Sequence, residues 1–132
     1  MVQLNSILKV TDKTCVVLVQ CIKILGVSSK KKIAFLGDVI LVSVQWINLR
    51  KFALLKPRLQ VRYLKGTIHR GLVIRTKINF IRGSGFWIKF DENVTILVTR
   101  AVVPVSNRVY GPVLRELCMR WPSLGCVSSC II

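Results

Sequence analysis

Acidic side chains are scarce in this sequence. Its 132 residues include 5 Asp and Glu against 21 Lys and Arg, for a formal net charge of +16. An excess of one sign on this scale repels itself and indicates a polyanionic partner. With a single histidine, the titratable groups that could serve catalysis near neutral pH are Asp12, Asp38, His69, Asp91, Glu92 and Glu116. They show no Ser/His/Asp order and no metal-ligand spacing, and the chain has no phosphate-binding glycine loop, so we predict no enzyme and no catalytic residue.

Long apolar runs are missing as well. The longest, residues 33–47, contains Gly37 and Asp38 and is shorter than the roughly twenty clean apolar residues of a membrane-spanning helix. Residues 1–10 hold one cation and no apolar block, unlike a secretory signal or a transit peptide. We therefore expect no membrane insertion. Either the protein is made where it works, or a presequence is missing from this chain.

The five cysteines do not show the pattern of a disulfide framework. Their number is odd, and no CxxC pair occurs. Cys118, Cys126 and Cys130 could hold a soft metal only with His69 as the fourth ligand, and nothing in the spacing requires that. We expect reduced, mostly buried thiols, with no metal site and no cofactor.

Apolar residues are abundant in spite of the charge. They make up 52% of the sequence, which excludes a disordered basic tail. Five segments are rich in β-branched or alternating apolar residues: 16–25, 38–46, 72–78, 86–90 and 94–99. Short strands at these intervals predict a small barrel or sandwich. Between two of them, Arg82-Gly83-Ser84-Gly85 should form a hairpin loop in which both glycines supply positive φ angles.

One helix is predicted, late in the chain. Gly111-Pro112 should open it, because proline in a first turn loses no hydrogen bond. Residues 113–120 are good helix formers, and Pro122 should end the helix. No internal repeat, low-complexity tract or Gly/Ser linker marks a second domain, so a single domain is expected.

The cations are concentrated in the middle of the chain. Residues 39–90 contain eleven Lys and Arg and no acid. In the predicted strand 72–78, alternation places Arg75 and Lys77 on one face and the apolar residues on the other. We expect the apolar face to pack in the core and the basic face to meet phosphate, with a merely solvated face as the alternative.

Two further basic segments leave alternatives open. Lys30-Lys31-Lys32 is expected in a loop, where a lone triplet is commonly just solvated. The irregular segment from Arg50 to Lys65 has aromatic residues in or beside it, namely Trp46, Phe52 and Tyr63. Aromatics among cations suit base stacking in RNA, and they equally suit the anchoring of a long hairpin.

Two other classes of function compete with a structural, RNA-bound role. A free single-strand-binding module would need stacking aromatics in one groove. Phe86, Ile88 and Phe90 are expected in the core, which leaves chiefly Trp46 and Trp87 for stacking. A protein at an anionic membrane surface would need an amphipathic basic helix, and the predicted helix is too short to supply one.

Four ordered motifs point to one family. The main motif consists of Gly71, Leu72-Val73-Ile74, Ser84-Gly85, Phe90, Asn93 and Ile96-Leu97. The others are Cys21 to Gly26, Gly37 to Ile40, and the box from Arg108 to Leu117 (RVYGPVLREL). Over about residues 8–117 the sequence resembles the universal large-subunit ribosomal protein fourteen family.

The resemblance implies a mainly β fold. This is a closed five-stranded β-barrel with a projecting β-ribbon and one or two short C-terminal helices. The barrel would span about residues 1–105, the C-terminal helical segment about 106–122, and a divergent tail 123–132. It also implies a structural constituent of the large ribosomal subunit that binds large-subunit rRNA near the subunit interface. Its partners would be neighbouring large-subunit proteins, small-subunit rRNA through an intersubunit bridge, and a ribosome-silencing factor.

Site residues follow partly from the resemblance, which assigns Arg75, Lys77 and Lys89 to the rRNA-facing side. With the basic segments, the expected rRNA-binding residues are Lys30, Lys31, Lys32, Arg50, Lys51, Arg70, Arg75, Lys77, Arg82 and Lys89. Arg108, Tyr110 and Arg115 in the C-terminal box are the expected protein-interface or intersubunit residues.

The departures from the family pattern are informative. Lys13-Thr14-Cys15-Val16 stands where the family has an Asn-Ser-Gly-Ala turn, which must be remade without its glycine. Ser106-Asn107 replaces Gly-Thr, which counts against silencing-factor docking. About ten residues are extra between Asn48 and Tyr63, and the tail lacks the usual ending.

The expected location follows from sequence drift. The N-terminus matches the family start, and several usually polar positions are apolar or Cys. This predicts an organelle-encoded protein of the mitochondrial ribosome, in the mitochondrial matrix, ahead of a plastid or bacterial one.

Overall fold

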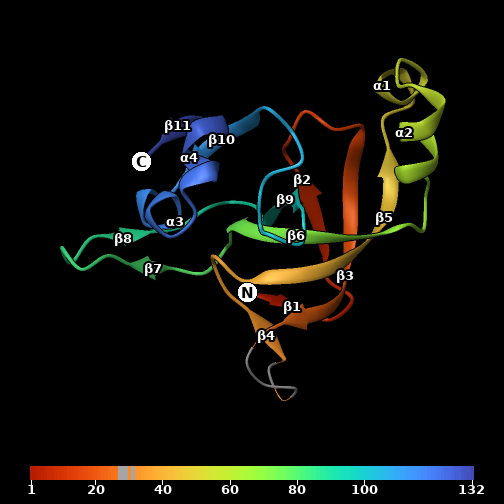
Figure 1. Ribbon diagram of the computed structural model, residues 1–132. Coiled ribbons are helices and arrows are strands. Elements are labelled where there is room, and N and C mark those ends of the chain that lie inside the picture. The colour runs from red at the N-terminus through yellow and green to blue at the C-terminus, as the bar shows by residue number, and fades with distance from the viewer. Residues whose placement is uncertain (27–29, 31) are drawn as a thin grey trace.

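Five strands close into a barrel at the centre of the computed structural model, which describes residues 1–26, 30 and 32–132 (Figure 1). They are β2 (Ile7–Val10), β3 (Val16–Leu25), β5 (Val39–Ile47), β6 (Ile68–Arg75) and β9 (Val94–Val98). All neighbours pair antiparallel except β2 and β9, which pair parallel and close the barrel. β1 (Val2–Gln3) and β4 (Ile33–Ala34) form a separate two-stranded sheet. The expected mainly β fold with a closed five-stranded barrel is confirmed.

Two apolar cores share the walls of this barrel. One holds the barrel residues Leu8, Val19, Val42, Val73 and Leu97. The other holds Leu72, Ile74 and Ile96 from the same two strands, β6 and β9, together with apolar residues of the C-terminal segment. Alternate residues of β6 and β9 therefore face different cores, and all of β9 is buried.

This arrangement corrects the prediction of one apolar and one basic face for residues 72–78. Val73, on the face expected to be basic, is fully buried, and so are Leu72 and Ile74 on the other face. The strand ends at Arg75, so its alternation does not extend to Lys77. A strand between two cores reads as a continuous apolar run, and here the run is Leu72-Val73-Ile74.

The projecting ribbon consists of β7 (Phe80–Ile81) and β8 (Trp87–Ile88) (Figure 1). Its expected hairpin loop is present, since the Arg82 N–H donates to the Phe86 carbonyl (2.9 Å). Of the two loop glycines, Gly85 has a positive φ (87°) and Gly83 does not, so the expectation that both supply one is wrong for Gly83. Phe86 was expected in the core and is instead 73% exposed, because the loop carries it beyond both cores.

The C-terminal segment folds against β6 and β9. It contains β10 (Val109–Val113), α3 (Arg115–Arg120), α4 (Pro122–Val127) and β11 (Ser128–Ile131), which pairs parallel with β10. Gly111-Pro112 lies inside β10, so its predicted role as a helix opening is wrong, and the helix begins at Arg115. Pro122 ends α3 as expected and also opens α4.

The basic segment between β5 and β6 is helical. It forms α1 (Leu49–Ala53) and α2 (Pro57–Arg62), so the long-hairpin interpretation is wrong. Asn48 caps α1 by accepting hydrogen bonds from the N–H groups of Arg50 and Lys51. The two helices stand at the far end of β5 from the C-terminal helices (Figure 1).

The cysteines differ from expectation in their burial. Cys15 and Cys21 lie in the barrel core, Cys118 is half-buried, and Cys126 and Cys130 are exposed. The exposed pair lies on α4 and β11, at the surface of the C-terminal segment. Within residues 1–26, 30 and 32–132, no three His, Cys, Asp or Glu side chains gather as metal ligands would. In the same residues, no helix has the length and apolar character needed to cross a membrane.

Candidate nucleic-acid interface

The predicted rRNA-binding cations fall into two groups by burial. The exposed ones are Lys30, Lys32, Arg50, Lys51, Lys77 and Lys89. The half-buried ones are Arg70, Arg75 and Arg82, and Lys31 lies outside the described residues. An exposed cation is open to phosphate from solvent, whereas a half-buried guanidinium already contacts its own protein.

The exposed cations do not form one patch. Lys30 and Lys32 precede β4, and Arg50 and Lys51 lie on α1, which stands apart from β4 (Figure 1). Lys77 follows β6, and its backbone N–H donates to Asn93 Oδ1 (3.0 Å). An RNA that touched all of these residues would have to wrap around the barrel.

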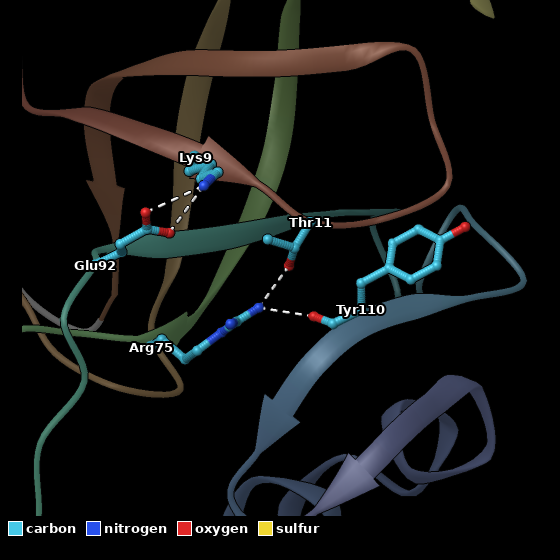
Figure 2. A network of polar contacts seen from close by, with 5 residues as sticks. All are labelled: Lys9, Thr11, Arg75, Glu92 and Tyr110. Carbon is cyan, nitrogen blue, oxygen red and sulfur yellow. Dashed lines mark hydrogen bonds and ion pairs between the residues drawn. The ribbon is translucent and has the colours of Figure 1, made fainter.

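Arg75 is an internal clamp. Its Nη2 donates to Thr11 Oγ1 (3.0 Å) and to the Tyr110 carbonyl (2.8 Å), joining the end of β6 to the chain after β2 and to β10 (Figure 2). A Cβ at Gly111 would lie 2.6 Å from Arg75 Nη1, so only glycine allows this close approach. Burial lowers the pKa of the Arg75 guanidinium, since the charged form loses water.

Glu92 supplies the neighbouring ion pair. Both of its carboxylate oxygens lie 3.1 Å from Lys9 Nζ, linking β2 to the turn before β9 (Figure 2). Both side chains are about half exposed, and exposed pairs of this kind contribute roughly 0–1 kcal/mol. The pair orients the turn more than it stabilises the fold.

The hollow beside Arg75 is unsuited to phosphate, because its charges cancel. Its volume is about 360 Å³, and it is lined by Arg75, Lys89, Phe90, Asp91, Glu92 and Pro112. Two cations and two carboxylates leave it with almost no net charge. The hollow therefore has little electrostatic attraction for an anion.

Arg82 latches the ribbon to the C-terminal segment. Its Nε lies 2.7 Å from Glu116 Oε1 on α3, and Nη2 donates to the other carboxylate oxygen (3.3 Å). The same Nη2 also donates to the carbonyl of Ile132. Paired guanidinium and carboxylate groups of this kind give directional contacts. Arg82 thus joins the loop of the β7–β8 ribbon to α3 and to the end of the C-terminal segment.

The expected protein-interface residues all have exposed side chains, and hydrogen bonds fix the backbone that carries them. Arg108, Tyr110 and Arg115 are each exposed. The Tyr110 N–H donates to the Thr11 carbonyl (2.8 Å), and the Arg115 N–H donates to the Ile132 carbonyl (2.9 Å). This C-terminal segment therefore presents two cations and an aromatic ring from a fixed frame.

Asp12 is the structurally important residue that the sequence reasoning did not single out for a structural role. Its carboxylate is 4% exposed and accepts from the N–H groups of Thr14 (3.0 Å) and Leu97 (3.1 Å) and from the Thr14 hydroxyl. Burial raises the pKa of this carboxyl, and the hydrogen bonds oppose that effect. Asp12 thereby holds the turn through Lys13 and Thr14 by side-chain hydrogen bonds. The signal was an Asp two residues before Thr, a common side-chain turn.

A family comparison covers the whole chain. The family model described as ribosomal protein L14p/L23e matches residues 1–132. The match extends past the expected limits of about residues 8–117, and it takes in α1, α2 and the C-terminal tail.

Proposed function

The chain belongs to the ribosomal protein L14p/L23e family of structural, non-enzymatic proteins of the large ribosomal subunit, and from this premise we propose that it binds large-subunit rRNA near the subunit interface. As a member it is located in the ribosome, with rRNA and ribosomal proteins as partners. The family match over residues 1–132 is the observation that carries the proposal. The net charge of +16 supports it, because a surface of that sign needs polyanionic neighbours.

Within this role, some cations contact RNA directly and others hold parts of the protein in place. Exposed Lys77 and Lys89 above all meet phosphate, together with Lys30 and Lys32, and Arg50 and Lys51 belong to α1, which stands apart from them. Arg75 and Arg82 act indirectly, because their internal hydrogen bonds hold the C-terminal segment and the ribbon at fixed angles to the barrel. Half-buried Arg70 adds positive potential on β6. Folded rRNA is recognised largely by shape, so a rigid protein surface supplies the specificity.

The C-terminal segment is the proposed site of protein and intersubunit contacts. Arg108, Tyr110 and Arg115 would meet small-subunit rRNA through a bridge, or a neighbouring large-subunit protein. A ribosome-silencing factor is a less favoured partner, because Ser106, where the family has glycine, is buried and donates to the Arg108 carbonyl (2.7 Å). Of these two residues, only Asn107 is exposed, so it is the one that could contact such a factor.

We place the protein in the mitochondrial ribosome, within the mitochondrial matrix. Cysteine and aliphatic residues at usually polar family positions support this location. We also treat residues 1–132 as one domain, with the barrel to about residue 105 and the C-terminal segment after it, in which α4 extends the helical part to Val127. The two cores share strands β6 and β9, which supports a single folding unit.

A sucrose gradient of organelle lysate tests the proposal. The chain is followed with an antibody, with and without a high-salt wash. Co-migration with the large subunit and with whole ribosomes that survives the wash is the expected result. Release into light fractions at moderate salt would instead indicate a peripheral RNA-binding protein, and absence from the organelle fraction would overturn the location.

A further inference from the structure

The helical pair α1–α2 exposes more apolar surface than its own packing uses. Leu49 is 77% exposed, Leu54 87% and Val61 67%. Leu59 and Leu64 are exposed as well. Single exposed apolar residues are ordinary, but a cluster on one short segment marks an interaction surface.

This surface is rigidly attached to the barrel. Phe52 and Leu55 pack against the barrel core beside Tyr63, which is buried. The Gln60 amide donates to the carbonyls of Phe52 (3.2 Å) and Leu55 (3.1 Å), which ties α2 to α1. The remaining leucines and Val61 are therefore held outward by a fixed frame.

A hollow beside α1 offers a place for an incoming apolar side chain. It has a volume of about 370 Å³ and is lined by Val17, Trp46, Ile47, Asn48, Leu49 and Arg50. Trp46 is 65% exposed, so its ring forms an open wall and not part of the core. Arg50 is the only charged residue of the lining. An apolar side chain would fit the hollow, with a carboxylate beside it on Arg50.

The charge around the hollow has one sign. Residues 48–65 contain six Lys and Arg and no acid. A second copy of this chain would bring the same cations to the contact, so self-association is opposed by charge. The complementary partner is acidic.

We propose that α1–α2 and the adjoining hollow dock an acidic amphipathic segment of another large-subunit protein. Apolar side chains of that segment cover Leu49, Leu54 and Trp46, and its carboxylates meet Arg50 and Lys51. RNA fits less well, because phosphate contacts would leave the apolar side chains of Leu49, Leu54 and Val61 uncovered. The proposal rests on the large-subunit location proposed above.

Site-specific photo-crosslinking tests the proposal. The recombinant full chain, with a photo-reactive residue at Leu54, is reconstituted into large subunits from which the native chain has been removed. Gradient co-migration is measured on the same sample before illumination. A chain with the photo-reactive group at Phe35, which is also exposed but lies beside β4 and away from α1, is the position control.

The expected product at Leu54 is a protease-sensitive adduct whose peptide is net negative and alternates acidic with apolar residues. Its yield should fall at least fivefold in the Leu49→Ser, Trp46→Ser background and in the Arg50→Gln, Lys51→Gln background. Lys23→Gln with Arg120→Gln, two exposed cations on β3 and α3, should leave it unchanged.

The opposing results are distinct. A nuclease-sensitive adduct to rRNA, a basic peptide, or no adduct at Leu54 would overturn the docking proposal while normal co-migration upheld the ribosomal role. The same peptide captured from Phe35 would also overturn it. Failure to co-migrate would instead remove the premise, and the proposal with it.

Discussion

At the scale of single residues, a cation's surroundings decide its role more than its type does. Arg75 and Lys77 are two positions apart in the sequence, and both were predicted to face rRNA. The Arg75 guanidinium is held by Thr11 and Tyr110, whereas the Lys77 side chain is exposed. Reversing the charge of both residues would therefore disturb folding as well as RNA binding. The two roles have to be separated one residue at a time.

Arg75→Met should destabilise the protein by about 2 kcal/mol, the typical loss when hydrogen bonds to a charged group are removed. Lys77→Met should change the free energy of unfolding by no more than about 0.5 kcal/mol, as most exposed substitutions do. Urea unfolding measures both. Affinity for large-subunit rRNA should show the reverse order, with the larger loss in Lys77→Met. Equal destabilisation by the two variants would contradict the stabilising role of the hydrogen bonds that Arg75 donates to Thr11 and Tyr110.

His69 should make stability depend on pH. Its Nε2 lies 2.9 Å from the Arg62 carbonyl oxygen, and burial lowers its pKa below the ordinary value of about 6.5. At a pH between the lowered pKa of His69 in the folded protein and its ordinary pKa in the unfolded chain, the unfolded chain binds more protons than the folded one. The free energy of unfolding should therefore fall as pH drops below about 6.5 and level off below the folded-state pKa.

The control for this pH effect is His69→Gln, which keeps a donor near the Arg62 carbonyl and cannot titrate. Urea unfolding of both proteins at several pH values isolates the contribution of His69 from that of the carboxylates. The difference between the two proteins should shrink or reverse on acidification. A difference that stays constant with pH would show that His69 is equally easy to protonate in both states.

At the scale of elements, the regular strands were predictable and the connections were not. The β-branched runs predicted β3 and β5 to within a residue or so. Gly111-Pro112 looked like a helix opening, but the positive φ of Gly111 is not helical, and the pairing of Pro112 with Cys130 of β11 places the segment in a strand. Helices α1 and α2 are too short to show an amphipathic period, so their cations suggested an irregular segment. The conformation of these connections depends on contacts with distant parts of the chain, which local sequence preferences do not show.

Three glycines should respond differently to replacement by alanine. Gly83→Ala should change stability by less than about 0.5 kcal/mol, because its φ is not positive and its surroundings are open. Gly85→Ala should cost about 1 kcal/mol, since φ is 87° and the space is open. Gly111→Ala should cost about 3 kcal/mol, because φ is 82° and the new Cβ would displace the Arg75 guanidinium.

Thermal or urea unfolding of the glycine series orders the three variants. The combination of Gly111→Ala with Arg75→Met adds a direct check of the mechanism. If the methyl group acts by displacing Arg75, the double variant should lose less stability than the sum of the single losses. Strict additivity would show that the cost at Gly111 is backbone strain alone.

At the scale of the whole molecule, the motifs predicted the barrel but not that the C-terminal segment covers the outer face of two of its strands. A closed barrel with a ribbon and C-terminal helices followed from the family resemblance, and the fold agrees. Alternation along one strand could not reveal that the other face of β6 and β9 is covered by α3, α4 and β10, because that cover comes from distant sequence. The candidate interface is consequently more dispersed than one basic strand face.

A dispersed interface should still bind rRNA with a steep salt dependence. Each phosphate neutralised contributes about −0.7 to −0.9 to the slope of log K against log salt, so six to eight contacts give a slope of roughly −4 to −7. Lys77→Gln with Lys89→Gln should reduce the magnitude of that slope by about 1.4 to 1.8. Filter binding of the folded variants to large-subunit rRNA at several salt concentrations measures it.

The matched control for the salt dependence is Lys13→Gln with Lys23→Gln, which removes the same charge from exposed positions outside the proposed set. Its slope should match that of the unmodified protein if phosphate contacts are local. Both double variants have the same net charge, so a general electrostatic attraction would flatten both slopes equally. Equal flattening would therefore contradict the assignment of Lys77 and Lys89, because only direct phosphate contact distinguishes two proteins of identical charge.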